Sequence, residues 1–581
     1  MSKLIVSTNE ESVRDIIDIT TEAGVKLSNS SFKKYYSVAS FKKINFDNEN
    51  FYTCEEGAIT SAGSLIYNER IGCVALKSIL VEFIKHRNVK KIKQHIIGNY
   101  VLVIELEGEL YIFGDSNDVF DIFYHSNKEQ WTVSNSLFDA SKKNSPVVSY
   151  NNLIESIFQN GILDNGTIFK NIFRLKGDEF IYVCLSDKSF NIIKHEEVKV
   201  DNVTDDSLAK SCESLANSIA KAFKDIAICM TGGLDSRLLL SSYLTCGSKP
   251  NLFYGVGNSS LTNTKKEDLD INKLIAKRFD LELNVMDWEV DNAFSCNWEA
   301  LTNKVGFLST VYSGIESVHN ELGELAGSRF IDFGYFGEPF RNIEVLAEST
   351  RVSYTTEQFV DELYINQELK KSLKKVDYRD YRLSLINKVK KLCESKAIDD
   401  NQITKDDFCK IHNEYRKSAD TVLINLANYY CYSINLLSLH KIETAVKTYP
   451  ALEKENSKLL LKIINKLQPE ILKIPIFSHC KPYTLDGTEL EIKSTGGNSF
   501  KKVLKNKLRK FDVVKKAVHL FRAKKKNNGI NSKVEKKLIS MLDESILMST
   551  FSKRTFDYCD LRRFSKYIQT MKIINSMKKK E

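Results

Sequence analysis

Short apolar runs separated by turn residues dominate the first 190 or so positions of this chain. Two pairs of these runs have the spacing of β-hairpins, each pair joined by a turn of polar residues and glycine or serine. The paired runs are residues 100–106 with 110–115 and residues 180–185 with 190–193. We therefore predict a mostly β first domain over residues 1–200.

From about residue 205 the rhythm changes to apolar strands that alternate with helices, which is typical of a parallel sheet covered on both faces. Beyond about residue 345 apolar positions recur at helical spacing, notably over 421–439 and 459–472. The strands are predicted at 226–230, 252–256, 283–286 and 330–333, and the first helices at 237–246 and 270–279. The fold class predicted is α/β and α+β in several domains, with an α/β domain over 205–490 and a basic helical extension over 491–581.

Charge is concentrated in one segment. The 581 residues carry a net charge of +9, yet residues 501–526 hold twelve Lys and Arg against one acid, so the remainder is about −2. Apolar residues recur at helical spacing there, which predicts an amphipathic cationic helix. It can dock on the protein itself, contact a membrane surface or bind nucleic acid, and nucleic acid is the least favoured.

The twelve cysteines are scattered singly, without paired metal or redox spacing, and the N-terminal residues lack the apolar stretch of a signal peptide. No run of eighteen apolar residues is present. We therefore expect reduced cysteines and a cytoplasmic protein.

The segment Thr231-Gly232-Gly233-Leu234-Asp235-Ser236 follows a predicted buried strand and opens a helix. Two glycines let the backbone approach a phosphate, and the helix presents free N–H groups to the anion. Asp235 can hold magnesium, while the hydroxyls of Thr231 and Ser236 can donate to phosphate oxygens. A glycine turn with a capping aspartate is the plain alternative. The Walker A pattern is absent, which disfavours a phosphoryl-transfer NTPase.

This loop resembles the [ST]-G-G-x-D-S loop of the asparagine synthetase family, and Phe333-Gly334-Tyr335-Phe336-Gly337-Glu338 resembles the family's second phosphate and metal loop. Other segments that resemble the family in order are 97–101, 114–115, 122–124, 166–169, 267–271 and 449–453. The resemblance implies a glutaminase-type N-terminal nucleophile hydrolase domain, followed by an ATP pyrophosphatase domain.

Members of this family adenylate a carboxylate with ATP and let an amine displace AMP. The resemblance implies ATP and Mg²⁺ as cofactors, with Asp235 and Glu338 as the metal ligands and residues 231–236 as the pyrophosphate cradle. It further places Val256, Phe333 and Gly334 beside the nucleotide. Arg237 replaces a common serine, and could bind a phosphate or carboxylate or be a solvated residue of the helix.

The sequence departs from the family at three positions. Tyr335 stands where asparagine synthetases have a glutamate; relatives resembling β-lactam synthetases use a tyrosine there as a base, and packing beside adenine is the alternative. Ser2 replaces the nucleophilic cysteine, so we expect an inactive glutaminase domain. Ile474 takes the place of the phosphate lysine, which leaves Lys473 or Lys481 as substitutes.

The preferred interpretation is an ATP-dependent amide ligase that acts on a small-molecule, peptide or sugar-acid carboxylate, with ammonia or an amine as nucleophile. Three alternatives stay open: a true asparagine synthetase, a catalytically inactive partner protein, and, disfavoured, a tRNA-modifying pyrophosphatase. A homodimer and membrane contact through 501–526 are the further partner expectations.

Overall fold

The computed structural model describes residues 2–144, 146–159, 161–195, 203–256, 263–287, 330–341, 351–365, 369–370, 373, 375–478 and 481–485. The predicted basic helix at 501–526 and the whole 491–581 extension lie outside these residues.

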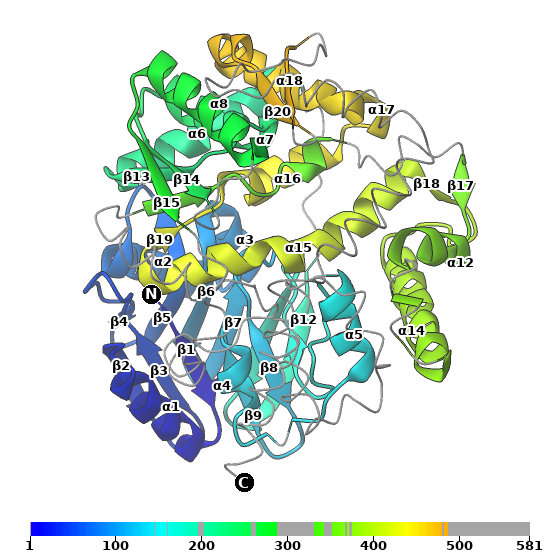
Figure 1. Cartoon of the computed structure of the whole chain (residues 1–581). Coiled ribbons are helices and arrows are strands. Elements are labelled where there is room, and N and C mark those ends of the chain that lie inside the picture. Colours follow the sequence, from blue (N-terminus) through cyan, green and yellow to red (C-terminus); the bar gives the residue numbers. More distant parts are fainter. Residues whose placement is uncertain are drawn as a thin grey trace, which may run out of the picture.

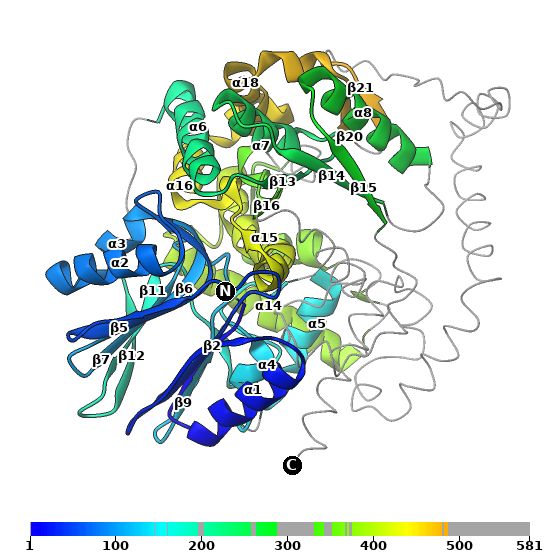
Figure 2. The same cartoon turned by 90° about the vertical axis from the view of Figure 1, so that its left-hand side faces the viewer.

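Two antiparallel six-stranded sheets form the N-terminal part, with helices on both outer faces (Figure 2). In β1 (Leu4–Ser7), Leu4 and Val6 face the second sheet, whereas Ile5 packs on α1 (Glu10–Glu22), as the two-residue period of a strand requires. On the far side of the second sheet α2 (Gly72–His86) and α3 (Val89–His95) close the apolar core. The result is a four-layer αββα sandwich.

The first sheet has the order β10-β8-β9-β1-β3-β2 and the second β12-β11-β7-β6-β5-β4. Both predicted hairpins are confirmed, because β6 pairs with β7 and β11 with β12. Glu107 and Gly108 have φ of +51° and +82°, as the tight turn between β6 and β7 demands. The remaining strands are β2 (Leu27–Phe32), β3 (Ser37–Phe41), β4 (Phe51–Thr53), β5 (Gly57–Tyr67), β6 (Ile96–Leu106), β7 (Glu109–Gly114), β8 (Phe123–Ser126), β9 (Trp131–Ser134), β10 (Phe173–Arg174), β11 (Glu179–Cys184) and β12 (Ser189–Lys194).

A five-stranded parallel sheet lies above the sandwich in the view of Figure 1. Its order is β15-β14-β13-β16-β19, so the chain runs outward from β13 to β15 and then crosses to the other side of β13. In such sheets ligands bind at the carboxyl ends of the strands where the order reverses, which here is between β13 and β16. The strands are β13 (Ile226–Cys229), β14 (Asn251–Val256), β15 (Leu283–Asp287), β16 (Phe330–Phe333) and β19 (Tyr432–Ser433), and the flanking helices include α6 (Asp205–Ala222), α7 (Leu234–Thr245), α8 (Asn263–Phe279), α16 (His440–Lys447) and α18 (Lys458–Leu467).

The C-terminal helices differ from the prediction in two places. The segment 421–439 is not one helix: α15 (Lys405–Tyr430) ends at Tyr430, and β19 and a 3₁₀ turn follow. Nearly every side chain there is buried, so periodicity could not separate a buried helix from a buried strand. In 459–472, α18 ends at Leu467, and Pro469 opens a 3₁₀ turn (Pro469–Lys473), since proline cannot continue the helix.

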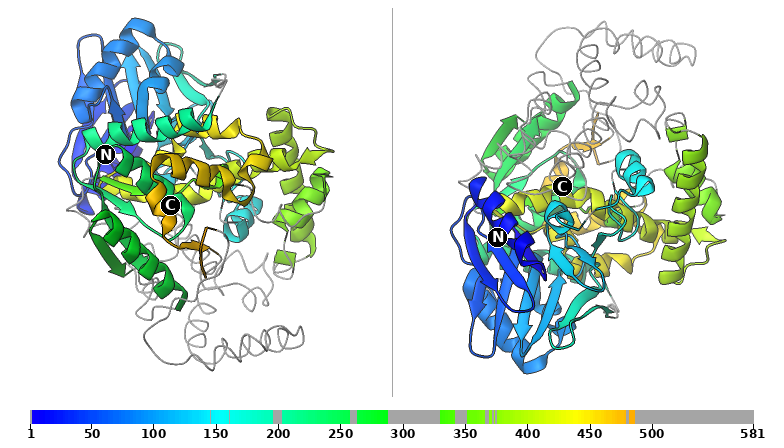
Figure 3. Two further views of the ribbon diagram at one scale, coloured as in Figure 1. Left: turned by 90° about the horizontal axis from the view of Figure 1, so that it is seen from above. Right: turned by 90° about the horizontal axis from the view of Figure 1, so that it is seen from below.

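Helix α15 ties the parts together. It has 26 residues, hence a length of about 39 Å. Its C-terminal half lies in the core of the parallel sheet, and its N-terminal half joins a second apolar core with α14 (Lys375–Ser395), α12 (Thr356–Phe359) and α5 (Tyr150–Gln159). Helices α12 and α14 form an arm at one side of the molecule (Figure 3).

Among the described residues, no helix has both the length and the hydropathy to cross a bilayer. The two antiparallel sheets followed by the parallel sheet and its helices confirm the predicted mixed α/β class with a β-rich N-terminal part.

Candidate nucleotide and metal site

The first predicted loop, residues 231–236, spans the turn after β13 and the first three residues of α7, whose N-cap is Gly233. Ser236 closes the turn, since its Oγ accepts from the Thr231 N–H at 3.2 Å and donates to the Thr231 carbonyl at 2.8 Å. The Gly232 N–H donates to Asp268 Oδ1 of α8 at 2.6 Å. A Cβ on Gly232 would lie 2.7 Å from that oxygen and 2.7 Å from Phe477 Cβ. This crowding by Asp268 and Phe477 is sufficient to require glycine at position 232.

The second predicted loop, residues 333–338, lies directly against the first. A Cβ on Gly334 would lie 2.9 Å from Ser236 Cα, and a Cβ on Gly337 would lie 2.1 Å from Asp235 Cγ. Both glycines are therefore required by the contact between the loops. Phe336 between them has a φ of +65°, a conformation in which a bulky residue is strained. The structure thus brings the two sequence-predicted loops together at the point where the strand order reverses.

Asp235 and Glu338 share a cation in this arrangement. Arg341, at the end of the 3₁₀ turn Glu338–Phe340, places its Nη2 2.8 Å from Asp235 Oδ2 and 3.5 Å from Glu338 Oε1. Burial raises the pKa of Asp235 to about 6, with Glu338 adding to the rise and Arg341 opposing it. Two carboxylates this close repel each other when ionised, so the site favours a bound cation.

The residues present fit a magnesium ion. The second carboxylate oxygen of Asp235, Oδ1, is buried and has no hydrogen-bond partner. Magnesium takes oxygen ligands and commonly uses one or two carboxylates with substrate phosphates and water. Within the described parts of the chain no group of three or more His, Cys, Asp or Glu could hold a metal. A pair of carboxylates therefore suits an ion that arrives with phosphate oxygens.

Arg237 differs from both sequence interpretations, because it is neither at the phosphate cradle nor in solvent. Its side chain is fully buried, and its guanidinium donates to the carbonyls of Ile471, Ile474 and Pro475. Burial lowers its pKa to about 10. These carbonyls belong to the 3₁₀ turn Pro469–Lys473 and the two residues after it. Arg237 therefore holds this segment against α7.

The two candidate lysines occupy different places. The Lys473 side chain is 68% exposed and forms an ion pair of 2.5 Å with Glu470, which also pairs with Arg278 at the end of α8. Lys481 begins β21 (Lys481–Tyr483), which pairs with β20 (Ile476–Ser478). The Phe477 N–H of β20 donates to the Gly232 carbonyl at 2.8 Å. The hairpin that carries Lys481 therefore contacts the first loop, whereas Lys473 is engaged at the surface.

The residues predicted beside the nucleotide are partly in the core. Phe333 is 1% exposed and meets Phe253 edge-on at 6.1 Å, so any contact between Phe333 and adenosine would come from its backbone. The Tyr335 ring stacks on Phe333 with centroids 5.9 Å apart. Val256 is the last residue of β14, at the carboxyl edge of the sheet, three residues beyond Phe253, which pairs with the last residue of β13.

Ser2, at the position of the family's nucleophile, is completely buried. Its hydroxyl donates to the Lys42 carbonyl at 2.6 Å, and its carbonyl accepts from Asn135. Next to it, the buried ammonium of Lys3 lies 3.1 Å from Asp139, which is also buried. These contacts enclose residue 2 in the sandwich and leave its hydroxyl engaged with backbone.

Sequence reasoning missed two residues of the site. Asp268 belongs to a segment that resembles the family, but the resemblance gave it no role; it accepts from Gly232 and from the Tyr254 hydroxyl. Arg341 follows the second loop by a few residues and belongs to no motif. A basic residue close after a predicted metal loop is the available signal, and it is weak.

No protein-family model matches this sequence. No curated protein matches it either. Among solved structures, glutamine PRPP amidotransferase from B. subtilis, complexed with ADP and GMP, is 10% identical, covers 57% of this chain and 91% of its own, and has a TM-score of 0.24. NMN synthetase from Francisella tularensis is 12% identical over 22% of this chain and half of its own, with a TM-score of 0.16.

Glutamine-dependent NAD⁺ synthetase from Acinetobacter baumannii, in complex with ADP, is 12% identical over 29% of this chain and 41% of its own, with a TM-score of 0.14. At these scores the similarity carries no functional argument. The function is therefore argued from the two loops themselves.

Proposed function

We propose that this chain is an ATP-dependent ligase that adenylates a carboxylate and transfers the acyl group to an amine. The observation that carries the proposal is the contact between the two glycine loops. This contact places the carboxylates of Asp235 and Glu338 against the Arg341 guanidinium, at the N-terminus of α7. A helix N-terminus binds anions, and paired carboxylates bind the magnesium that accompanies them. Together these groups make a site for a polyphosphate.

The proposed reaction balances in two steps. A carboxylate oxygen of the substrate attacks the α-phosphorus of ATP, the bond from that phosphorus to the bridging oxygen breaks, and pyrophosphate leaves. The amine nitrogen then attacks the acyl carbon, AMP departs with the carbon–oxygen bond pair, and the amine gives up a proton to a base. Magnesium, when bound, neutralises the phosphate charge. In this proposal the N–H groups at the start of α7 and the hydroxyls of Thr231 and Ser236 hold the β- and γ-phosphates.

Arg341 has a double role in this proposal. Its guanidinium contacts both carboxylates that would hold a metal ion, so arginine and magnesium would compete for the same negative charge and Arg341 must move away when magnesium arrives. The side chain is 37% exposed and sits beside the first loop, so it can turn to the phosphates once released. It would then supply the positive charge that the family places at the position of Ile474. We infer that Arg341 replaces the missing phosphate lysine.

The nitrogen donor in this proposal is ammonia or a substrate amine rather than glutamine. Ser2 is buried, with its hydroxyl bonded to a backbone carbonyl, which supports an inactive N-terminal domain. Tyr335 remains the candidate base, because it lies in the second loop two residues before Gly337. Its ring stacks on Phe333, which restricts the orientation of the side chain.

ATP–pyrophosphate exchange tests the proposal. The full-length protein is incubated with ATP, magnesium, labelled pyrophosphate and panels of amino acids, peptides and sugar acids. We expect exchange with one panel, and its loss in Asp235→Ala. Failure of every carboxylate, with ATP binding intact, would support the inactive-partner alternative instead. Exchange that survives in Asp235→Ala would show that this loop is not the site.

A further inference from the structure

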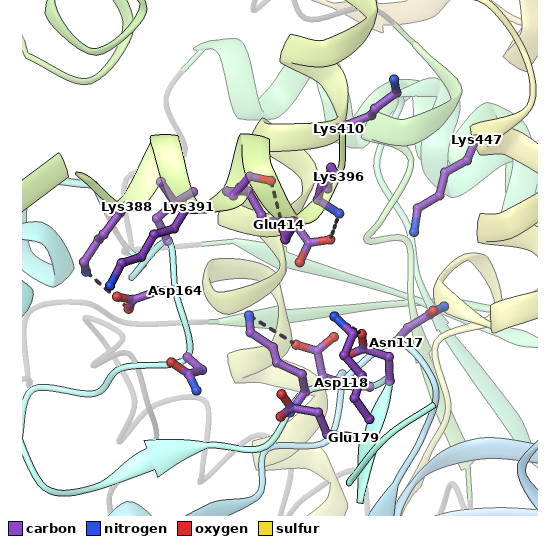
Figure 4. Close-up of a pocket in the computed structure, with 18 of the residues that line it drawn as sticks. Asn117, Asp118, Asp164, Glu179, Lys388, Lys391, Lys396, Lys410, Glu414 and Lys447 are labelled. Carbon is purple, nitrogen blue, oxygen red and sulfur yellow. Dashed lines mark hydrogen bonds and ion pairs between the residues drawn. The ribbon is translucent and has the colours of Figure 1, made fainter. Parts of the chain in front are cut away.

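A large cavity lies away from the two loops, between the sandwich and the helical arm (Figure 4). Its volume is about 1510 Å³, larger than the usual range of about 300–1,000 Å³ for small-molecule sites. One wall consists of α14, the N-terminal half of α15 and the residues after α16. The other consists of loops of the N-terminal part around residues 116–118, 163–165 and 176–179.

Helix α14 turns a polar face to this cavity. The lining positions Asp380, Ser384, Asn387, Lys391 and Ser395 recur at helical spacing on one side of the helix. The opposite side, which includes Tyr381, Leu385 and Val389, is buried in the apolar core of the arm. The polar face is therefore turned toward the cavity by the packing of α14, and few of the lining side chains are apolar.

The two walls carry opposite charge. The helical wall presents six lysines against three acids, whereas the wall of the N-terminal part presents four acids against two lysines. Figure 4 shows labelled lysines on the helices above and Asn117, Asp118 and Glu179 on the segments below. The six lysines are Lys388, Lys391, Lys396, Lys410, Lys447 and Lys454, and the four acids are Asp118, Asp164, Asp178 and Glu179.

At one end of the cavity the walls are joined. Lys388 of α14 reaches Glu155 at 2.6 Å and Asp164 at 3.3 Å across the junction, and this buried contact fixes the arm to the N-terminal part. One turn further along α14, Lys391 is exposed toward the cavity, and within the described parts of the chain no hydrogen bond or ion pair engages it. An ammonium that lines a cavity without a partner is available to a ligand.

The charge distribution restricts the ligand. The many charged side chains on both walls favour a charged, polar ligand over a lipid, and the acidic wall disfavours a polyanion such as nucleic acid. We propose that the cavity binds a polar ligand that carries both carboxylate and amino groups, with its carboxylates toward Lys391 and its amino groups toward Glu179 on the acidic wall. This inference is independent of the ATP site.

Saturation-transfer NMR on the full-length protein tests it with four probes. Two carry both signs: the capped peptide Ac-Lys-Gly-Gly-Glu-NH₂ and the amino sugar acid muramic acid. Two capped peptides carry one sign only, Ac-Glu-Gly-Gly-Glu-NH₂ and Ac-Lys-Gly-Gly-Lys-NH₂. We expect a probe of both signs to bind more tightly than either single-sign peptide, and the affinity to fall as salt rises. The probe that binds distinguishes a peptide from a sugar acid.

The variant Lys391→Glu reverses a charge without breaking an interaction of the described residues, and we expect it to weaken binding about tenfold. The matched control is Lys390→Glu on the same helix, where Lys390 pairs with Glu357 at 3.4 Å and does not line the cavity. Three results would overturn the proposal. They are a single-sign peptide that binds as tightly as the mixed-charge probes, equal effects of Lys391→Glu and Lys390→Glu on binding, and no binding of either mixed-charge probe. Asp235→Ala should bind the probes normally, which separates this result from the ATP site.

Discussion

Removal of the Arg341 guanidinium is expected to move metal binding and nucleotide binding in opposite directions. In Arg341→Ala the pair Asp235 and Glu338 loses the cation that now lies 2.8 Å and 3.5 Å from its oxygens. Without nucleotide, a metal ion no longer competes with the arginine and should bind more tightly. With nucleotide, the variant lacks a positive charge for the phosphates and should bind it more weakly.

The size of the effect follows from the contact. A guanidinium and a carboxylate whose charge centres are about 4 Å apart attract by about 4 kcal/mol at an effective dielectric constant of 20, and by about 1 kcal/mol in bulk water. The Arg341 side chain is 37% exposed, so solvent screening favours the lower part of that range, about 1–2 kcal/mol. We therefore expect a change in metal affinity of roughly 5- to 30-fold.

Electron paramagnetic resonance with Mn²⁺ measures the metal affinity of the nucleotide-free protein. Calorimetry with α,β-methylene ATP, which cannot release pyrophosphate, measures nucleotide affinity. Arg341→Lys keeps the charge and should restore most of the nucleotide affinity. Arg278→Ala is the control, because Arg278 is a surface arginine that pairs with Glu470. If Arg341→Ala weakens both affinities together, or leaves both unchanged, the competition between arginine and metal is refuted.

Four further outcomes are expected. Because the pKa of Asp235 rises from 3.8 to about 6, its ionised form costs about 3 kcal/mol of folding stability above pH 6, and this cost fades between about pH 6 and pH 4. Asp235→Asn should therefore stabilise the protein to urea at pH 8, not at pH 4, while it abolishes pyrophosphate exchange; equal stabilisation at both pH values would contradict this reasoning. Tyr335→Phe should retain exchange but lower amide formation at least about 100-fold, and a parallel loss of both would indicate packing alone. Arg237→Ala should cost about 3 kcal/mol in urea unfolding, since it leaves three carbonyls without their buried donor, and a loss of ATP affinity without a loss of stability would restore a phosphate role. Lys473→Ala should bind ATP within about twofold of the unchanged protein, because its ammonium pairs with Glu470 at the surface.

The sequence predicted correctly those features of the fold that depend on a few neighbouring residues. Strand, turn and helix signals placed β13 to β16 and both hairpins, because each depends on a few neighbouring residues. The two glycine loops were also found, since a close approach of backbone leaves glycine as a sequence signal. The strand β19 was missed because it is two residues long and follows directly on a helix that is buried on nearly all sides.

Arg237 shows why the rest could not be predicted. From sequence it is a helix N-terminal residue beside a phosphate loop, and a solvated or phosphate-bound side chain is the natural expectation. Its partners are carbonyls more than 230 positions further along the chain, so only the packing of that segment under α7 decides its role. Arg341 is the converse case, because its charge acts on Asp235 across 106 positions and no pattern around it predicts that contact.

Gly232 shows that a correct prediction can have a different physical cause. The sequence argument assigned this glycine to close approach of a phosphate, whereas in the structure Asp268 and Phe477 occupy the space where its Cβ would be, and its N–H is already donated to Asp268. Phosphate binding by that N–H would require Asp268 to withdraw. The N–H groups of Thr231 and Gly233 and the hydroxyls of Thr231 and Ser236 form contacts of 2.8 to 3.4 Å within the loop. A phosphate that binds to these groups must therefore replace hydrogen bonds within the loop, just as a metal ion must displace Arg341 from Asp235 and Glu338. Without ligands, the loop's own groups and Arg341 thus make the contacts that a nucleotide and a metal ion would make.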